Sequence, residues 1–266
     1  MITKTRVSPD TQNGCKVKNY NHYRYCATYG FHLNRTIITR KFTNNSYYAN
    51  IYYFYLMFEV KRFVHNKMAE NSYLLSAGNG DALLIDPGAN SKAERDSIDN
   101  YIKENSLNPL AIVLTHGHFD HIAGAAWARD YYKIKTWLHI DDKEELTAAA
   151  HAASVYNVNM EYVFTEADNY FEGEPVLRFG SLEIHVLHTP SHSKGSVCLY
   201  LPDGDILFAG DTTYNGTIGY SNDGFASLIK VIKEKILTLS PSTMVYSGHG
   251  LPCMISELRL PSSARR

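Results

Sequence analysis

Residues 115–121 have the sequence Thr115-His116-Gly117-His118-Phe119-Asp120-His121, which places three imidazoles and one carboxylate in one short stretch. Directly before it comes the apolar run 110–114, and such a run predicts a buried strand. A lone histidine at a strand end is more often structural than functional, but no structural role calls for so many polar rings together. The stretch therefore predicts a metal site at the edge of a sheet.

The chain has 266 residues, enough for one large domain or two small ones. Its formal net charge of −1 gives no reason to expect nucleic acid or a membrane surface as a partner. The longest apolar stretch, residues 49–58, has about half the length that a transmembrane helix needs. The four cysteines lack paired spacing, which argues against disulfides and a cysteine-based zinc site and favours a reducing, cytoplasmic location. They are Cys15, Cys26, Cys198 and Cys253.

The N-terminal segment, residues 1–56, differs from the rest of the chain. It is rich in Tyr, Asn, Thr and basic residues and shows little periodicity. The composition changes at Met57, and from Phe58 the residues alternate as in a half-buried strand. We expect one main domain over residues 57–266, preceded by an uncharacterised extension that is disordered or a mis-called part of the gene product. The alternative is a species-specific N-terminal arm.

Strands and helices are expected to alternate through the main domain. We expect strands over 58–64, 71–77, 82–85, 110–114, 136–140, 182–187, 197–201, 206–208 and 244–246. We expect helices over about 91–104, 122–131, 141–153 and 224–237, the first opened by a capping box of Ser91 and Glu94. This order predicts an α/β protein with mixed sheets.

Four of the expected strands end in residues that commonly bind metals: at 116–121, His192, Asp211 and His249. His116 and His118 alternate in an extended segment, so both can face one ion. Asp120 and His121 come where the chain enters a helix, and can face a second ion. The sequence therefore predicts half-sites for two metals in one loop.

These motifs resemble the metallo-β-lactamase fold superfamily. The resemblance rests on residues 115–121, Thr189-Pro190-Ser191-His192-Ser193, Gly210-Asp211-Thr212, Ser247-Gly248-His249-Gly250 and Asp86-Pro87-Gly88. It runs from about Met57 to near the C-terminus and leaves the first segment uncovered. It implies an αββα sandwich, two mixed β-sheets flanked by helices, with a dinuclear metal site at the edge.

The resemblance also implies a ligand set. One metal would take His116, His118 and His192, and the other would take Asp120, His121 and His249, while Asp211 would bridge both. Histidine and carboxylate ligands without a thiolate suit Zn²⁺, two per chain, and also admit Fe or Mn. A water between two such cations loses a proton near neutral pH, and the hydroxide attacks a carbonyl carbon. Asp120 is the predicted catalytic residue, holding or relaying a proton.

The spacing most resembles the glyoxalase II-like, or hydroxyacylglutathione hydrolase-like, branch of the superfamily. This implies hydrolysis of a thioester or another small ester-like substrate. Relatives usually continue with Arg-Thr-Asp where this chain has Tyr220-Ser221-Asn222, and have Gly in place of Ser191. Full glyoxalase II enzymes also carry a helical domain that binds glutathione, whereas this chain ends soon after His249. Neither the glutathione site nor the thioester substrate is therefore carried over from those enzymes.

Two other functions remain as alternatives. A persulfide dioxygenase-like oxidoreductase would hold a single Fe(II) with His116, His192 and Asp211 and leave positions open for O₂. A non-catalytic binding protein on the same fold is the other, but degenerate members usually lose ligands and every expected ligand is present. We expect a small-molecule substrate and no nucleic-acid or membrane partner; the sequence does not predict the oligomeric state.

Residues around the expected ligands have two interpretations. Asp86 either orients a metal ligand or forms a turn. His188 is expected to be structural or to support the site, and His139, His151 and His185 are expected to be structural. The tyrosines 156, 162, 214 and 220 form an aromatic wall of the substrate pocket or reflect the high tyrosine content of the chain.

Overall fold

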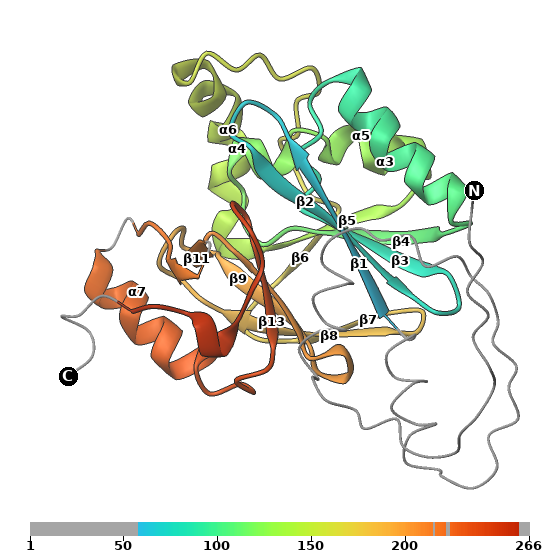
Figure 1. The fold of residues 1–266 in the computed structure, drawn as a ribbon. Helices are drawn as coiled ribbons and strands as arrows, with labels where there is room; N and C mark the ends of the chain where they lie inside the picture. Colours follow the sequence, from blue (N-terminus) through green and yellow to red (C-terminus); the bar gives the residue numbers. More distant parts are fainter. Residues whose placement is uncertain (1–57, 215, 222–223, 261–266) are drawn as a thin grey trace, which may run out of the picture. The chain divides into compact units, whose positions relative to one another are not determined.

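A computed structural model describes residues 58–214, 216–221 and 224–260 (Figure 1). All of them lie in the compact unit formed by residues 46–266. The predicted N-terminal extension lies outside the described residues, so its boundary at residue 57 stays a prediction.

The first sheet has six strands in the order β1-β2-β3-β4-β5-β6. They are β1 (Phe58–His65), β2 (Glu70–Ala77), β3 (Asp81–Ile85), β4 (Asn108–Val113), β5 (Lys135–His139) and β6 (Asn169–Phe171). The first three strands are antiparallel, joined by short turns, and the remaining pairs are parallel. The predicted strands of this part of the chain are confirmed, with ends that differ by one or two residues.

The second sheet also has six strands, in the order β14-β13-β10-β9-β8-β7. They are β7 (Val176–Phe179), β8 (Leu182–His188), β9 (Val197–Leu201), β10 (Ile206–Gly210), β13 (Met244–Ser247) and β14 (Cys253–Met254). Only β10 and β13 pair in parallel; the predicted hairpin of β9 and β10 is present. A separate two-stranded hairpin, β11 (Thr213–Tyr214) and β12 (Thr217–Ile218), was not predicted.

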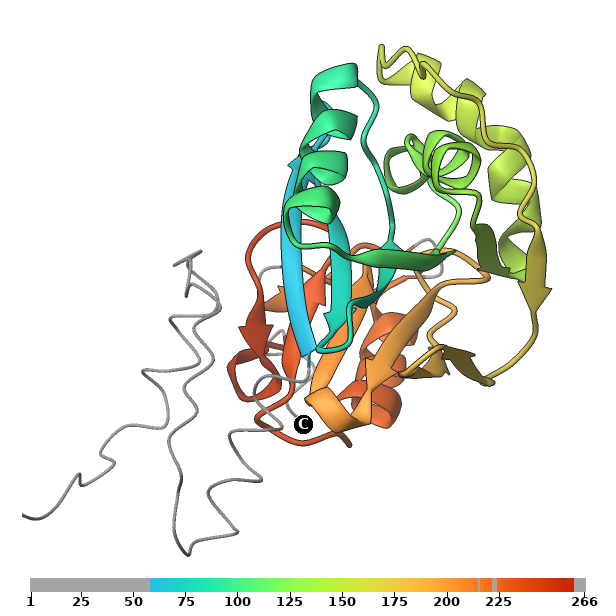
Figure 2. The same ribbon diagram turned by 90° about the vertical axis from the view of Figure 1, so that its right-hand side faces the viewer.

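Helices lie on the outer face of each sheet, and both sheets pack face to face (Figures 1 and 2). Against the first sheet lie α3 (Lys92–Glu104), α4 (Phe119–Ile122), α5 (Ala125–Tyr132) and α6 (Lys143–Val155). Against the second lies α7 (Phe225–Val231), which continues as a π-helical turn over Ile232–Ile236. The capping box predicted for α3 is present, with the Ser91 side chain accepting from Glu94 N.

Alternating side chains of the central strands supply two different cores. Leu74 and Leu84 pack under the helices, whereas their neighbours Leu75 and Leu83 pack between the sheets. Strands that are buried on both faces consist of apolar runs and do not alternate between polar and apolar residues. This is why residues 110–114 are all apolar. The helix, sheet, sheet and helix layers are those of the predicted αββα fold, which the structure confirms.

The helix predicted over 122–131 is confirmed as α5, but it begins three residues later than predicted. The chain forms the short α4, then turns at Gly124 and begins α5. The Gly124 N–H donates to the Pro87 carbonyl at 2.8 Å, and a Cβ at Gly124 would lie 2.8 Å from the carbonyl oxygens of Ala89 and Pro87. The break therefore lets the helix entrance pack against the loop after β3.

The ends of several strands meet along one edge between the sheets. The loops after β3, β4, β8, β10 and β13 all lie there, as does the beginning of the antiparallel strand β2. This arrangement gathers side chains that are far apart in the sequence. Among the described residues, no helix combines the length and hydropathy needed to cross a membrane.

Candidate metal centre

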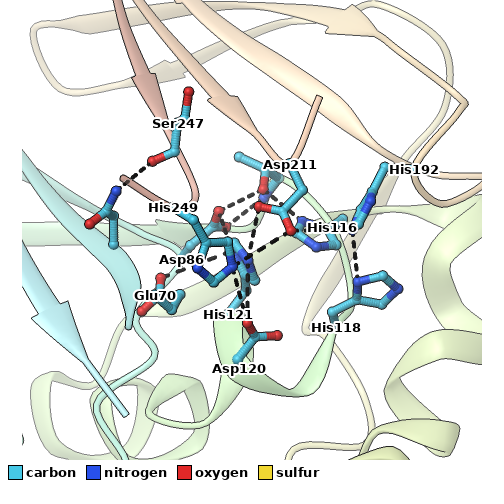
Figure 3. A network of polar contacts seen from close by, with 12 residues as sticks. Glu70, Asp86, His116, His118, Asp120, His121, His192, Asp211, Ser247 and His249 are labelled. Atoms are coloured by element: carbon cyan, nitrogen blue, oxygen red, sulfur yellow. Dashed lines mark hydrogen bonds and ion pairs between the residues drawn. The ribbon is translucent and has the colours of Figure 1, made fainter. Parts of the chain in front are cut away.

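The structure brings all seven predicted ligands together at this edge (Figure 3). Four come from the loop after β4 and the start of α4, and the others come from the loops after β8, β10 and β13. The residues are His116, His118, Asp120, His121, His192, Asp211 and His249. Their proximity supports the predicted site, while their role as ligands stays a prediction.

The first group consists of His116, His118 and His192. One nitrogen from each ring lies within 4.8 Å of the others. The ring of His116 makes edge contacts with the rings of His118 and His192, at centroid distances of 4.6 and 4.8 Å. His192 Nε2 lies 2.9 Å from His118 Nδ1. Three nitrogens at such distances suit coordination of one cation.

The second group consists of Asp120, His121 and His249, whose potential ligand atoms also lie within 4.8 Å of one another. Asp120 Oδ2 is 3.3 Å from His249 Nε2 and 3.9 Å from His121 Nε2. The group therefore offers two nitrogens and one carboxylate oxygen on the side of the centre away from His118.

Asp211 lies between the two groups. Its Oδ1 is 3.4 Å from His121 Nε2, and its Oδ2 is 3.4 Å from His192 Nε2 and 3.7 Å from His249 Nε2. Oδ2 thus faces one nitrogen of each group, and Oδ1 faces His121 of the second group. This is the position expected of a bridging residue.

Hydrogen bonds on the outer side of three rings turn their Nε2 atoms inward. His121 Nδ1 lies 3.0 Å from Asp86 Oδ2, His116 Nδ1 lies 3.0 Å from Thr115 Oγ1, and His192 Nδ1 donates to the Tyr220 carbonyl at 3.0 Å. Such partners fix the tautomer of a metal-binding histidine.

Several inward atoms are buried without a hydrogen-bond partner. They are His116 Nε2, His121 Nε2, Asp211 Oδ1 and Glu70 Oε1. Buried polar atoms are nearly always paired, so an unpaired set that faces one point needs an explanation. Three of the four belong to the predicted ligands, and metal ions would satisfy them.

The first group is electrostatically suited to cations. Burial lowers the pKa of His116 well below its ordinary value, and the imidazoles of His121 and His118 lower it further. Burial also lowers the pKa values of His118 and His192. All three rings are therefore neutral near pH 7, with lone pairs available for coordination.

Carboxyl groups concentrate around His121. Four carboxylates lie 3.0 to 3.9 Å from its ring nitrogens: Glu70, Asp86, Asp120 and Asp211. Burial alone would lower the pKa of His121, but Asp211 and Asp120 raise it well above its ordinary value. Buried carboxylates are costly unless cations balance them. The donor set and its charge thus both fit divalent metal ions.

Asp86 has both of the features that were considered for it: it forms a turn and it contacts a predicted ligand. Its Oδ1 accepts from Thr115 N at 2.7 Å, and its Oδ2 accepts from Thr115 Oγ1 at 2.6 Å. The same Oδ2 is the partner of His121 Nδ1. Asp86 has φ +46°, a left-handed conformation that Asp tolerates better than most residues. It is therefore both the turn residue after β3 and the residue that fixes His121.

Two buried carboxylates at the site were not predicted. Asp142 accepts from Gly117 N at 2.8 Å, Ser193 Oγ at 2.8 Å and Gly195 N at 2.6 Å, and so ties two ligand loops together. Glu70 lies at the start of β2, where it pairs with His249 in an isolated bridge. Burial raises the pKa of Glu70 well above its ordinary value, although His121 opposes this.

A further cluster of His139, Asp141 and His188 is not assigned as a metal site. The two rings stack at a centroid distance of 4.2 Å and an interplanar angle of 16°. Imidazole lone pairs lie in the ring plane, so nearly parallel stacked rings cannot both point at one ion. His188 Nε2 also bonds to the Lys194 carbonyl at 3.0 Å. The stacking supports the structural interpretation of His139, and the interpretation of His188 as structural or as a support of the site stays a prediction.

The four tyrosines of the proposed aromatic wall have different environments. Tyr214 is half-buried and its hydroxyl donates to Asp211 Oδ2 at 2.7 Å. Burial and that carboxylate raise the pKa of Tyr214, so the phenol keeps its proton. Tyr156 and Tyr220 are each 59% exposed, the former stacking on Phe119 of the ligand loop. Tyr162 lies under the Arg95 guanidinium instead.

Comparisons with known proteins show which proteins this chain is similar to. A family model described as the metallo-beta-lactamase superfamily matches residues 66–249. The probable metallo-hydrolase YqgX of Bacillus subtilis is 38% identical over 68% of this chain and 84% of its own. The hydroxyacylglutathione hydrolase GloC of Haemophilus influenzae is 28% identical over 68% of this chain and 85% of its own.

Solved structures show the same likeness. The BLEG-1 B3 metallo-beta-lactamase matches with a TM-score of 0.66 and 32% identity, over 74% of this chain and 95% of its own. TTHA1623, solved in a di-iron-bound form, matches with a TM-score of 0.63 and 30% identity, over 74% of this chain and 96% of its own.

Proposed function

The chain belongs to the metallo-beta-lactamase superfamily, and we propose that it is a metal-dependent hydrolase that acts on a thioester or another small ester-like substrate. The observation that carries the proposal is the pair of ligand groups that share Asp211. The likeness to YqgX and to GloC supports hydrolysis as the reaction class.

Two divalent ions bound by these groups would bring the pKa of water toward neutrality and polarise a substrate carbonyl. The chain itself supplies the fixed arrangement of donors. His116, His121 and His192 are held by bonds to their outer nitrogens, so their inner nitrogens need no reorganisation. Burial of five of the seven donors limits the access of water to them, whereas His118 and His249 are partly exposed.

Asp120 is the residue we propose for proton transfer. Its carboxyl is buried, and its pKa lies below the ordinary value because His121 and His249 outweigh the opposing effect of burial. It is therefore ionised near pH 7 and can accept a proton. Its Oδ2 lies 3.3 Å from Nε2 of His249, whose side chain is 25% exposed.

We propose two metal ions per chain, with zinc as the first candidate and iron as the second. The ligand types admit both. The di-iron form of TTHA1623 supports iron as a possibility for this chain. The mononuclear iron dioxygenase alternative would use only His116, His192 and Asp211, and would leave the second group of donors without a role.

The substrate is proposed to be a small molecule, and the protein is proposed to act in the cytoplasm without nucleic-acid or membrane partners. The exposed Tyr156 and Tyr220 lie beside residues of the ligand loops. They support a pocket wall that contacts the apolar part of such a substrate.

A hydrolase screen of the full chain tests the proposal. The purified protein, with its metal content measured, is assayed against glutathione thioesters, lactones and phosphodiesters. We expect turnover of a thioester or lactone and a rate for Asp120→Asn that is lower by about 100-fold or more, as for loss of a general acid or base. Asp130→Asn, at an exposed ion pair with Arg129, is the matched control. Equal rates for parent and Asp120→Asn would contradict the assigned mechanism.

A further inference from the structure

The hairpin of β11 and β12 brings a phenol to the centre. Tyr214 is the last residue of β11, and its hydroxyl donates to Asp211 Oδ2 at 2.7 Å. Its ring makes an edge contact with the ring of His249, at a centroid distance of 5.7 Å and an angle of 82°. One side chain thus contacts the bridging residue and a member of the second group.

The position of this phenol is set by the backbone around it. Tyr214 pairs with Thr217 across the hairpin, and Gly219 N donates to the Thr212 carbonyl at 3.0 Å. Thr213 Oγ1 lies 2.9 Å from Ser247 Oγ, directly before the His249 loop. The hairpin is therefore anchored both to the segment that carries Asp211 and to the strand that precedes His249.

The two oxygens of Asp211 have different surroundings. Oδ1 is buried without a hydrogen bond and faces His121, whereas Oδ2 accepts from the phenol. A carboxylate that faces two ligand groups at once needs a fixed χ2 angle. The χ2 angle of an aspartate is distributed broadly unless a contact restricts it. The phenol supplies a fixed donor on one oxygen only, so it keeps Oδ2 between His192 and His249 and leaves Oδ1 facing His121.

We propose that Tyr214 is a positioning residue of the metal centre, whose hydroxyl holds the Asp211 carboxylate in the orientation that serves both ligand groups. The inference rests on the metal centre proposed above. It differs from an aromatic wall because the hydroxyl, and not the ring, carries the role. Exchange of Tyr for Phe separates the two, since it removes the oxygen and keeps the ring against His249.

The test measures metal affinity and does not depend on knowing the substrate. The full-length parent and Tyr214→Phe are titrated with Zn²⁺ against a chromophoric chelator, and both are loaded with Co²⁺ for visible absorption spectra. The matched control is Tyr101→Phe, which removes a hydroxyl that donates to Glu59 Oε1, also at 2.7 Å, outside the centre. Circular dichroism of the metal-free proteins confirms that all three have the same fold.

We expect Tyr214→Phe to bind zinc roughly 10-fold or more weakly than the parent, as is typical when a partner of a metal ligand is removed. Its Co²⁺ absorption bands should change, and Tyr101→Phe should match the parent in both measurements. Zinc affinities within twofold, with identical Co²⁺ spectra, would overturn the role of Tyr214 and leave the proposed function standing. A parent that binds neither ion would overturn both.

Discussion

The two halves of the centre are built in different ways. The first sheet supplies four of its residues from one continuous loop, His116 to His121. The second sheet supplies His192, Asp211 and His249 from three separate loops. In the first half the spacing along the chain already places the side chains. In the second half only the packing of the strands brings the side chains together.

The halves are also held by different kinds of group. Buried carboxylates hold the first half: Asp86 fixes His121, and Asp142 accepts from the backbone at Gly117, although its other bonds reach the His192 loop. Backbone contacts hold much of the second half. Asn71 N donates to the Gly248 carbonyl at 2.7 Å, and the Tyr220 carbonyl accepts from His192. Charge substitutions should therefore weaken the first half most, and changes of backbone or volume the second.

The largest effect is expected where the halves meet, at Gly248. A Cβ there would overlap Asp211 Oδ1 and lie 2.5 Å from His121 Cε1. Gly248→Ala should lower the free energy of unfolding by about 1–3 kcal/mol through overpacking. It should also displace Asp211, and so abolish binding of the second ion at micromolar zinc. Denaturant unfolding and metal titration measure the two effects.

Gly173→Ala is the control for this substitution, because a Cβ at Gly173 meets nothing within 4 Å. Gly173 has φ +62°, so the substitution should lower the stability of the protein only through backbone strain. It should leave metal binding unchanged. If both variants bound two ions, Gly248 would not be the close contact between the halves that we infer.

A smaller effect is expected for the carboxylate that supports the first half. Asp86→Asn keeps the shape of the side chain but replaces one carboxylate oxygen with an NH₂ group. This donor would face another donor, on Thr115 or on His121. Metal affinity should fall roughly 10- to 100-fold. Asp81→Asn, at the other end of β3, should have no such effect. Metal titration that ranks the two variants equally would contradict the role of Asp86.

The smallest effect concerns the support behind Glu70. His65 is buried against Ser72, which bonds to Glu70, and burial lowers the pKa of His65 to about 4. The unfolded chain takes up a proton as the pH falls through about 6.5, while the folded chain stays neutral down to about 4. The free energy of unfolding therefore falls as the pH is lowered from about 6.5 to about 4.

Urea unfolding at pH 7.5 and pH 5.5 checks the sign. Between pH 7.5 and pH 5.5, the free energy of unfolding of the parent should fall by about 1.4 kcal/mol more than that of His65→Asn. The variant keeps a polar contact to Ser72 and cannot titrate. An equal loss in the two proteins would show that His65 is not held neutral.

Most of the fold was predictable because both sheets have strong local signals. The apolar run 110–114 and the Ser91 capping box each predict their element without knowledge of distant residues. The break at Gly124 was not predictable, since it depends on the Pro87 carbonyl in another loop. The strand β14 is two residues long and exists only by pairing with β13.

The residues of the site divide in the same way, into those with a local sequence signal and those that only the packing of distant segments brings to the site. The predicted ligands could be selected from the sequence because each lies in a recognisable motif that follows a strand, and their role as ligands stays a prediction. Glu70 begins a strand, and only the antiparallel direction of β2 brings it to the same edge. Asp142 has the local pattern of a first-turn helix acid, and its bonds to Ser193 and Gly195 cross from one sheet to the other. The hydroxyl of Tyr214 likewise gained its role only from the hairpin.

Anomalous scattering from a crystal of the zinc-loaded full chain tests the central claim most directly. We predict two peaks, one among His116, His118 and His192 and one among Asp120, His121 and His249, with Asp211 between them. A single peak held by His116, His192 and Asp211, with no density at Asp120 and His249, would contradict the account of two half-sites.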